Sequence, residues 1–181
     1  LDFVDVVNDV FGAGTLQDCP LDAADLSGDG IVNVLDIVAM VNIILGRVDM
    51  DDDATSAQLI KSDNALELSS DGYIGGVQMT LSHSNDFSIS LTDDALFSDY
   101  VTREEETTLI IVAPYSENLF TLTGNYQITD MIVANSLSEV DVSTPQIITL
   151  DPAYPNPFNP STTIRLSLIK ISRCRRIERC R

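Results

Sequence analysis

Six residues between Asp25 and Asp36 have the types and the spacing of a calcium-binding loop. In the segment DLSGDGIVNVLD, oxygen-bearing side chains stand at positions 1, 3, 5, 9 and 12. These positions, together with a backbone carbonyl at position 7, are the ligand positions of a twelve-residue calcium loop. The predicted metal ligands are Asp25, Ser27, Asp29, the carbonyl of Ile31, Asn33 and Asp36. Three carboxylates among neutral oxygens suit Ca²⁺, a hard cation that takes oxygen ligands.

Gly30 stands at position 6 of this loop, where the chain must turn sharply with positive φ. The alternative interpretation is an Asp-Gly turn before an N-capped helix, with the acids merely solvated. Because Asn33 and Asp36 also stand in register, the sequence favours calcium.

Two helices are predicted by an internal repeat. Residues 1–12 align with residues 35–46 at an offset of 34, and six of the twelve positions are identical. Leu35, Val38 and Leu45 form an apolar stripe at helical spacing in the second copy. Each copy ends in a glycine, as helices often do. Neither helix can bury its apolar face alone, so we expect the two to pack together.

The pattern DLSGDGIVNVLDIVAMVNIILG resembles a dockerin type I repeat, in which the loop ends in Asp. The resemblance covers residues 1–46. It implies a calcium-binding module of two loop–helix repeats that docks onto a cohesin domain through a helix face. The first repeat enters at its loop position 12, Asp2, so its other ligands are absent or lie upstream of residue 1, and a first calcium site is not carried over from the resemblance.

Residues 58–150 change to the alternating pattern of β-strands. Val77, Met79 and Leu81 alternate with polar residues, and residues 109–113 form a continuous apolar run. Such a run is typical of a strand buried on both faces. Seven or eight short strands predict an antiparallel β-sandwich, similar to the cohesin-like or immunoglobulin-like sandwiches that accompany dockerin repeats. The expected fold class is α+β.

Composition and motifs argue against several function classes. The net charge of −18, from 28 acids and 10 bases, disfavours binding to nucleic acid. No apolar stretch is long enough for membrane insertion. The only histidine is His83, and no nucleophile-elbow, zinc-protease or phosphate-binding motif occurs. We therefore expect no enzymatic activity and no catalytic residues.

A third segment begins at residue 151. Its PNPFNPSTTI sequence resembles the opening of the C-terminal sorting domain of type IX secretion cargo, which implies an extracellular or cell-surface location. A strand is predicted over Thr162–Leu168, and its apolar face is the predicted partner-binding site: Ile164, Leu166 and Leu168. An isolated strand must pair with its own sandwich or with another chain. The basic tail, 169–181, does not continue the pattern.

The predicted organisation is a dockerin-like module at 1–48, an acidic linker at 49–57, the sandwich at 58–150 and the truncated sorting-like segment at 151–181. It predicts an extracellular, calcium-binding structural protein whose partners are other protein chains, chiefly copies of itself joined head to tail. The alternative is the anchoring module of a larger secreted glycan-degrading enzyme or adhesin.

Overall fold

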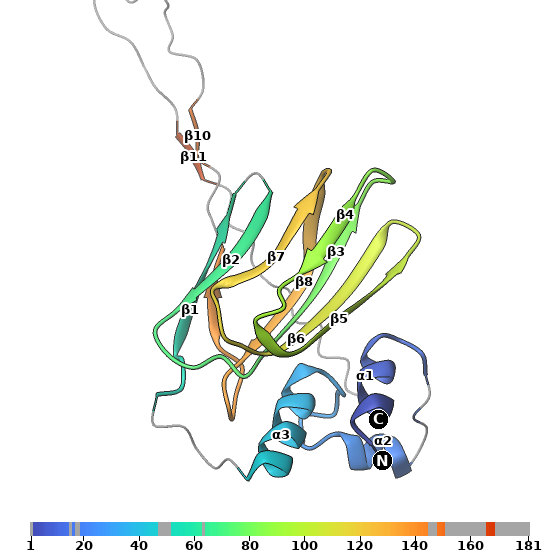
Figure 1. Ribbon diagram of the computed structural model, residues 1–181. Coiled ribbons are helices and arrows are strands. Elements are labelled where there is room, and N and C mark those ends of the chain that lie inside the picture. Colours follow the sequence, from blue (N-terminus) through green and yellow to red (C-terminus); the bar gives the residue numbers. More distant parts are fainter. Residues whose placement is uncertain are drawn as a thin grey trace, which may run out of the picture. The chain divides into compact units, whose positions relative to one another are not determined.

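The computed structural model describes residues 2–14, 16, 19–46, 52–62, 64–144, 148–150 and 166–168. It divides the chain into two compact units, Leu1–Ser143 and Thr144–Arg181. The described residues of the first unit form three helices and two sheets, which confirms the α+β class (Figure 1). Because helices and sheets share this unit, the boundary predicted at residue 48 does not separate two compact units.

The helices are α1 (Phe3–Val10), α2 (Cys19–Ala24) and α3 (Val34–Leu45). α1 and α3 are the two copies of the repeat, and they contact each other as predicted. Asp2 caps α1 by accepting a 2.9 Å hydrogen bond from the Asp5 backbone N–H. Gly46 ends α3 with φ of 63°, a left-handed conformation that glycine adopts without strain.

Nine strands build the two sheets of this unit. They are β1 (Ser56–Lys61), β2 (Ala65–Ser70), β3 (Gly76–His83), β4 (Ser88–Leu91), β5 (Ala95–Arg103), β6 (Glu106–Pro114), β7 (Asn118–Thr123), β8 (Tyr126–Ala134) and β9 (Asp141–Ser143). One sheet has the order β4-β7-β2-β1-β9 and the other β5-β6-β3-β8. All pairings are antiparallel except β1 with β9, which is parallel.

Strand β6 separates two hydrophobic cores. Leu109 and Ile111 face the core between the two sheets, whereas Ile110 and Val112 pack with the helices on the opposite face. All four side chains are at most 1% exposed. The prediction of a strand buried on both faces is thus confirmed, and the second covering layer is the helical module of the same chain.

The region predicted as a linker differs from expectation in its second half. The Ala54 side chain is fully buried, and β1 begins at Ser56. The carboxylate of Asp53 accepts hydrogen bonds from the backbone N–H and the hydroxyl of Ser136. The end of the predicted linker is therefore part of the sandwich.

The second unit contains a two-stranded antiparallel ribbon. β10 (Ile148–Leu150) pairs with β11 (Leu166–Leu168), with Ile148 opposite Leu168 and Leu150 opposite Leu166. Of the strand predicted over 162–168, the structure describes residues 166–168, which form β11 and pair with β10 of the same chain. Ile164 lies outside the described residues, so pairing of this strand between chains stays a prediction.

Candidate calcium site

The predicted calcium loop joins α2 to α3. Asp25 directly follows the last residue of α2, and Asp36 lies in the first turn of α3. Asn33 is the N-cap of α3, where its side-chain oxygen accepts a 2.7 Å hydrogen bond from the Leu35 backbone N–H. The two ends of the loop are thus fixed by helices.

The carboxylate of Asp25 organises the first half of the loop. It accepts backbone hydrogen bonds from Gly28 at 2.7 Å, Asp29 at 3.1 Å and Gly30 at 2.9 Å. The Ser27 hydroxyl donates a further bond of 3.2 Å. Desolvation raises the pKa of Asp25, but these four hydrogen bonds together outweigh it and hold the pKa below its ordinary value. Asp25 is therefore ionised at neutral pH.

The carboxylate of Asp36 closes the loop from the other end. One oxygen accepts a 2.9 Å bond from the Ser27 backbone N–H, and the other accepts a 2.8 Å bond from that of Asn33. The second bond completes a capping box. Asp36 is 0% exposed, so this carboxylate is removed from water.

No basic side chain of the described residues neutralises Asp36. The described Lys and Arg residues are Lys61, which lies over the Tyr126 ring, and Arg103, which lies beside Gly12. Burying a carboxylate is costly unless it is paired or coordinates a metal. The two N–H donors and the positive end of α3 offset part of this cost, and a bound cation would offset the rest.

The remaining predicted ligands lie in the same hydrogen-bond network. Asp29 accepts a 2.8 Å bond from the Ile31 backbone N–H and a 3.4 Å bond from the Asn33 amide. That amide also donates to the Ile31 carbonyl at 3.3 Å. The structure therefore brings all six predicted ligands into one loop network, with the Asn33 side-chain oxygen turned to its capping role.

The donor set fits a hard divalent cation. It consists only of oxygens, and an ionised carboxylate offers about four lone-pair sites, so the N–H bonds leave acceptor capacity free. Among the described residues, however, no three Asp, Glu, His or Cys side chains already converge into a metal cluster. Binding would therefore draw the carboxylates of Asp25, Asp29 and Asp36 together.

Sequence reasoning missed the residues that connect this loop to the sheet. The Gln78 side-chain oxygen on β3 accepts a 3.0 Å hydrogen bond from the Val34 backbone N–H at the start of α3. Gly75 and Gly76 leave room for the side chains of Val34 and Val38. A Gly-Gly pair at the start of a strand pattern is the one signal that could have indicated such close approach.

His83 does not form a catalytic arrangement in the described residues. Its Nε2 lies 2.8 Å from the Thr107 hydroxyl, and its ring stacks on Phe87 with the centroids 4.1 Å apart. Nδ1 lies 3.2 Å from the Ser84 backbone carbonyl, whereas the Ser84 hydroxyl donates to Asp86. No described carboxylate or serine hydroxyl bonds to the ring, as a Ser-His-Asp triad would require.

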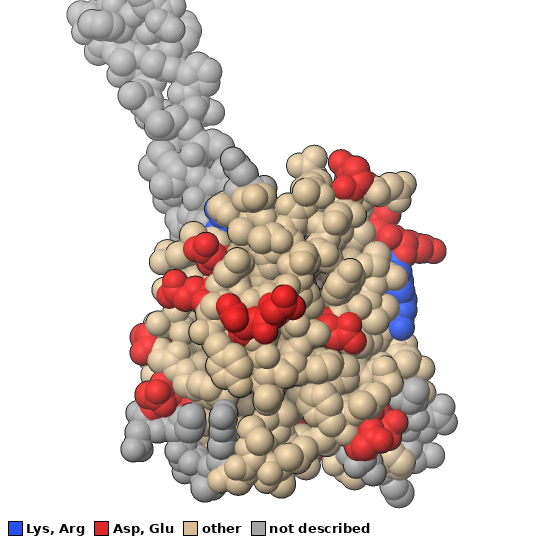
Figure 2. All heavy atoms as spheres, in the orientation of Figure 1, with Lys and Arg blue, Asp and Glu red and all other residues tan. Residues whose placement is uncertain are grey.

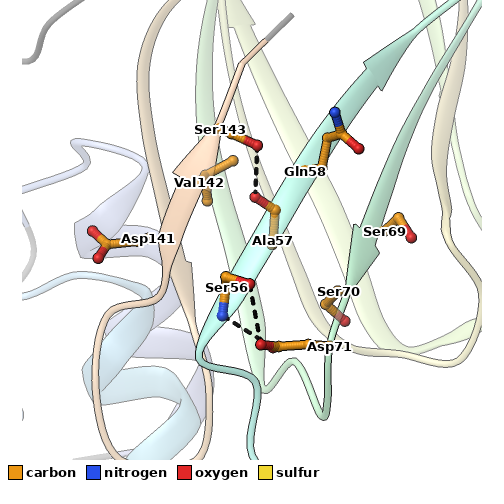
Figure 3. Close-up of a pocket in the computed structure, with 9 residues that line it drawn as sticks. All are labelled: Ser56, Ala57, Gln58, Ser69, Ser70, Asp71, Asp141, Val142 and Ser143. Carbon is orange, nitrogen blue, oxygen red and sulfur yellow. Dashed lines mark hydrogen bonds between the residues drawn. The ribbon is translucent and has the colours of Figure 1, made fainter.

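A hollow of about 640 Å³ lies where β1 meets β2 and β9 (Figure 3). One of its two acids, Asp71, accepts bonds from the backbone N–H groups of Thr55 at 2.8 Å and Ser56 at 3.0 Å. Hydrogen bonds from Ser56 and Thr55 hold the pKa of Asp71 far below its ordinary value. Figure 3 shows Asp141 pointing away from Asp71. The carboxylate of Asp71 is thus used in hydrogen bonds that hold the start of β1.

Comparison of the chain with protein-family models, curated proteins and solved structures found no match. Among the described residues, no helix has the length and apolar character needed to cross a membrane.

Proposed function

We propose that this chain is an extracellular, non-enzymatic structural protein that binds one Ca²⁺ in the Asp25–Asp36 loop and assembles with copies of itself. The observation that carries the proposal is the buried carboxylate of Asp36, which no described basic side chain neutralises. Asp25, Ser27, Asp29, Asn33, Asp36 and the Ile31 carbonyl would hold the ion. The ion would supply positive charge and cross-link the two halves of the loop.

The position of the loop gives calcium a structural role beyond the loop itself. Its last ligand, Asp36, lies in the first turn of α3, and that turn packs on β3 through Val34. A cation that binds only the folded form stabilises that form by mass action. Calcium would therefore favour the docked arrangement of helices and sheet, which is the state suited to assembly.

The resemblance to dockerin repeats supports a docking role for the helical module. In this chain the apolar faces of α1 and α3 are already used against the four-stranded sheet. This use favours a self-contained structural subunit, because the faces of α1 and α3 that pack on the sheet are not free for a separate cohesin-bearing scaffold. The PNPFNPSTTI segment supports the extracellular location.

One observation favours the alternative of an anchoring module. The end of α3 leaves Ile43 70% and Ile44 67% exposed, and exposed apolar side chains in a group mark interaction sites. A foreign partner could dock there. The anchoring module and the structural subunit differ in self-association, which is measurable on the purified chain.

Sedimentation velocity in Ca²⁺, in Mg²⁺ and in chelator tests the proposal. We expect concentration-dependent assembly in Ca²⁺ that chelator reduces. Asp25→Asn with Asp29→Asn should remove the calcium effect, whereas Asp93→Asn, an exposed acid outside the loop, should retain it. A chain that remains monomeric at all concentrations and calcium levels would reject the structural role in favour of the anchor.

A further inference from the structure

We infer that the helix-facing surface of the β5-β6-β3-β8 sheet is an exchangeable docking surface whose second occupant is the helical module, α1 to α3, of another copy of this chain. The inference deepens the proposed assembly function and rests on it. It names the two surfaces that meet when copies associate.

The sheet surface cannot remain uncovered in water. Ile110, Val112 and Ala134 are at most 1% exposed only because the helices lie on them. Phe97 at the β5 edge makes an edge-to-face contact with Phe3 of α1, with ring centroids 5.2 Å apart. Without the module this face would be a contiguous apolar patch, which soluble proteins cover or use for binding.

The fit between α3 and the sheet is specific in shape. A methyl group added at Gly76 would lie 2.7 Å from a Val34 methyl and 2.8 Å from a Val38 methyl. At Gly75 it would lie 2.7 Å from the other Val38 methyl. The two glycines thus form a recess for two valines one helical turn apart, and few unrelated helices would match it.

Polar contacts fix the direction of the helix on the sheet. At the start of α3, the Val34 backbone N–H donates to Gln78 at 3.0 Å. Near its end, the Asn42 amide donates to the Ser136 carbonyl at 3.1 Å. A helix laid in the opposite direction would lose both bonds. The surface therefore recognises this module in one orientation.

A second copy of the chain presents the same module and the same surface. The contacts join residues 44 and 94 positions apart, and the chain passes between helices and sandwich once, between Gly46 and Asp52. The same contacts can therefore also form between two chains, as in domain swapping, at the additional entropic cost of association. Helix and sheet surfaces are unlike, so successive exchange joins chains head to tail.

Calcium would set how readily exchange occurs. The calcium loop includes Asn33 and Asp36, which cap the turn of α3 that enters the recess. Removing calcium loosens this turn and lowers the barrier to release. Returning calcium then fixes whichever pairing has formed, so concentrated samples should retain interchain docking.

A disulfide across the recess reports which chain supplies the helix. In a background with Cys19, Cys174 and Cys180 changed to Ser, Val34→Cys and Gly76→Cys place two thiols at the helix–sheet contact. Samples are depleted of calcium, returned to calcium at several protein concentrations, oxidised and run on non-reducing gels. Val34→Cys alone and Gly76→Cys alone serve as controls for accidental cross-linking.

We expect covalent dimers and larger species whose fraction rises with protein concentration, because an intrachain bond would be independent of concentration. A monomer band alone at every concentration would overturn the inference. If the double variant fails to fold, two differently tagged wild-type populations are mixed, taken through the same calcium cycle and co-precipitated. Failure of the tagged chains to co-precipitate would also overturn it.

A calcium titration of the same wild-type sample separates this inference from the function on which it rests. If the chain binds calcium but does not exchange its helical module, the proposed calcium site stands and the exchangeable docking surface is rejected. If the module exchanges but no calcium binds, the calcium site is rejected and the docking surface stands.

Discussion

Asp36 contributes to two structures at once: the loop that begins at Asp25 and the N-terminus of α3. Its two oxygens bond to the backbone N–H groups of Ser27 and Asn33, and the side chain is fully buried. An aspartate used only for capping would normally remain partly in water, because desolvating its charge is costly. The burial of Asp36 is therefore the observation that supports the proposed cation.

A second buried polar group lies in the core between the sheets. The Tyr126 hydroxyl is buried and has no hydrogen-bond partner among the described residues. Tyr126→Phe removes this unsatisfied group and keeps the ring that packs on Phe120. We expect stabilisation of about 1 kcal/mol, since an unmade hydrogen bond costs about 1–3 kcal/mol. Urea unfolding checks it, and a loss of stability would show that the hydroxyl has a partner.

The same tyrosine gives a stability change at high pH. Desolvation raises the pKa of Tyr126 to about 12, above the value of about 10 for an unfolded chain. The free energy of unfolding therefore does not depend on this ionisation below about pH 10, and it falls as the pH rises towards 12, because the unfolded chain loses the proton first. Tyr126→Phe should lose less stability between about pH 10 and pH 12 than the wild-type chain, because phenylalanine does not ionise. Melting temperatures from pH 8 to 11 measure it, and parallel curves for the two proteins would contradict it.

Helices and strands that bury a continuous apolar face were predicted from the sequence, whereas short or half-exposed ones were not. The 109–113 run and the repeat at residues 1–12 and 35–46 predict β6, α1 and α3 because their apolar patterns match the faces that they bury. β5 was not predicted, since it is an edge strand with half-exposed residues on both faces and no alternation. The six-residue α2 is too short for a periodic pattern.

In the candidate site, too, some residues could be predicted from the sequence and others could not. The six proposed ligands were chosen from the sequence alone, because the geometry of a calcium loop fixes the spacing of its oxygens along the chain, and the structure places all six in one hydrogen-bonded loop. The role of Gln78 could not be predicted, since it depends on α3 meeting β3, which is 44 positions away. Contacts of this kind arise from packing between distant elements, so no characteristic spacing of residues in the sequence predicts them.

The recess at Gly76 gives a prediction at this scale. Gly76→Ala places a methyl 2.7 Å from Val34 and 2.8 Å from Val38. Overpacking of this kind costs about 1–3 kcal/mol. Combining it with Val38→Ala should recover part of the loss, so the two changes should be non-additive in a double-mutant cycle. Additive losses measured by chemical unfolding would show that the helix does not enter the recess.

At the scale of the whole molecule, acidity opposes self-association. The chain carries a net charge of −18, and acidic side chains are spread over the face shown in Figure 2, where basic ones are few. Copies of the chain therefore repel one another at low ionic strength. Calcium bound in the proposed site would reduce this charge, and salt would screen what remains.

Salt should therefore promote assembly. Raising ionic strength from 0.01 M to 0.1 M shortens the screening length from about 30 Å to about 10 Å. We expect the assembled fraction in calcium to increase over this range, as measured by light scattering. Matched samples in sucrose instead of salt control for crowding. Dissociation by salt would indicate that assembly depends on ion pairs, contrary to the apolar docking described above.

Isothermal titration calorimetry of the calcium-free chain measures whether the loop from Asp25 to Asp36 binds calcium. We predict one Ca²⁺ per chain, loss of binding in Asp29→Asn, and unchanged binding in the matched exposed variant Asp93→Asn. If the wild-type chain gives no binding isotherm, or if wild type and Asp29→Asn bind calcium equally, the loop from Asp25 to Asp36 is not a calcium site.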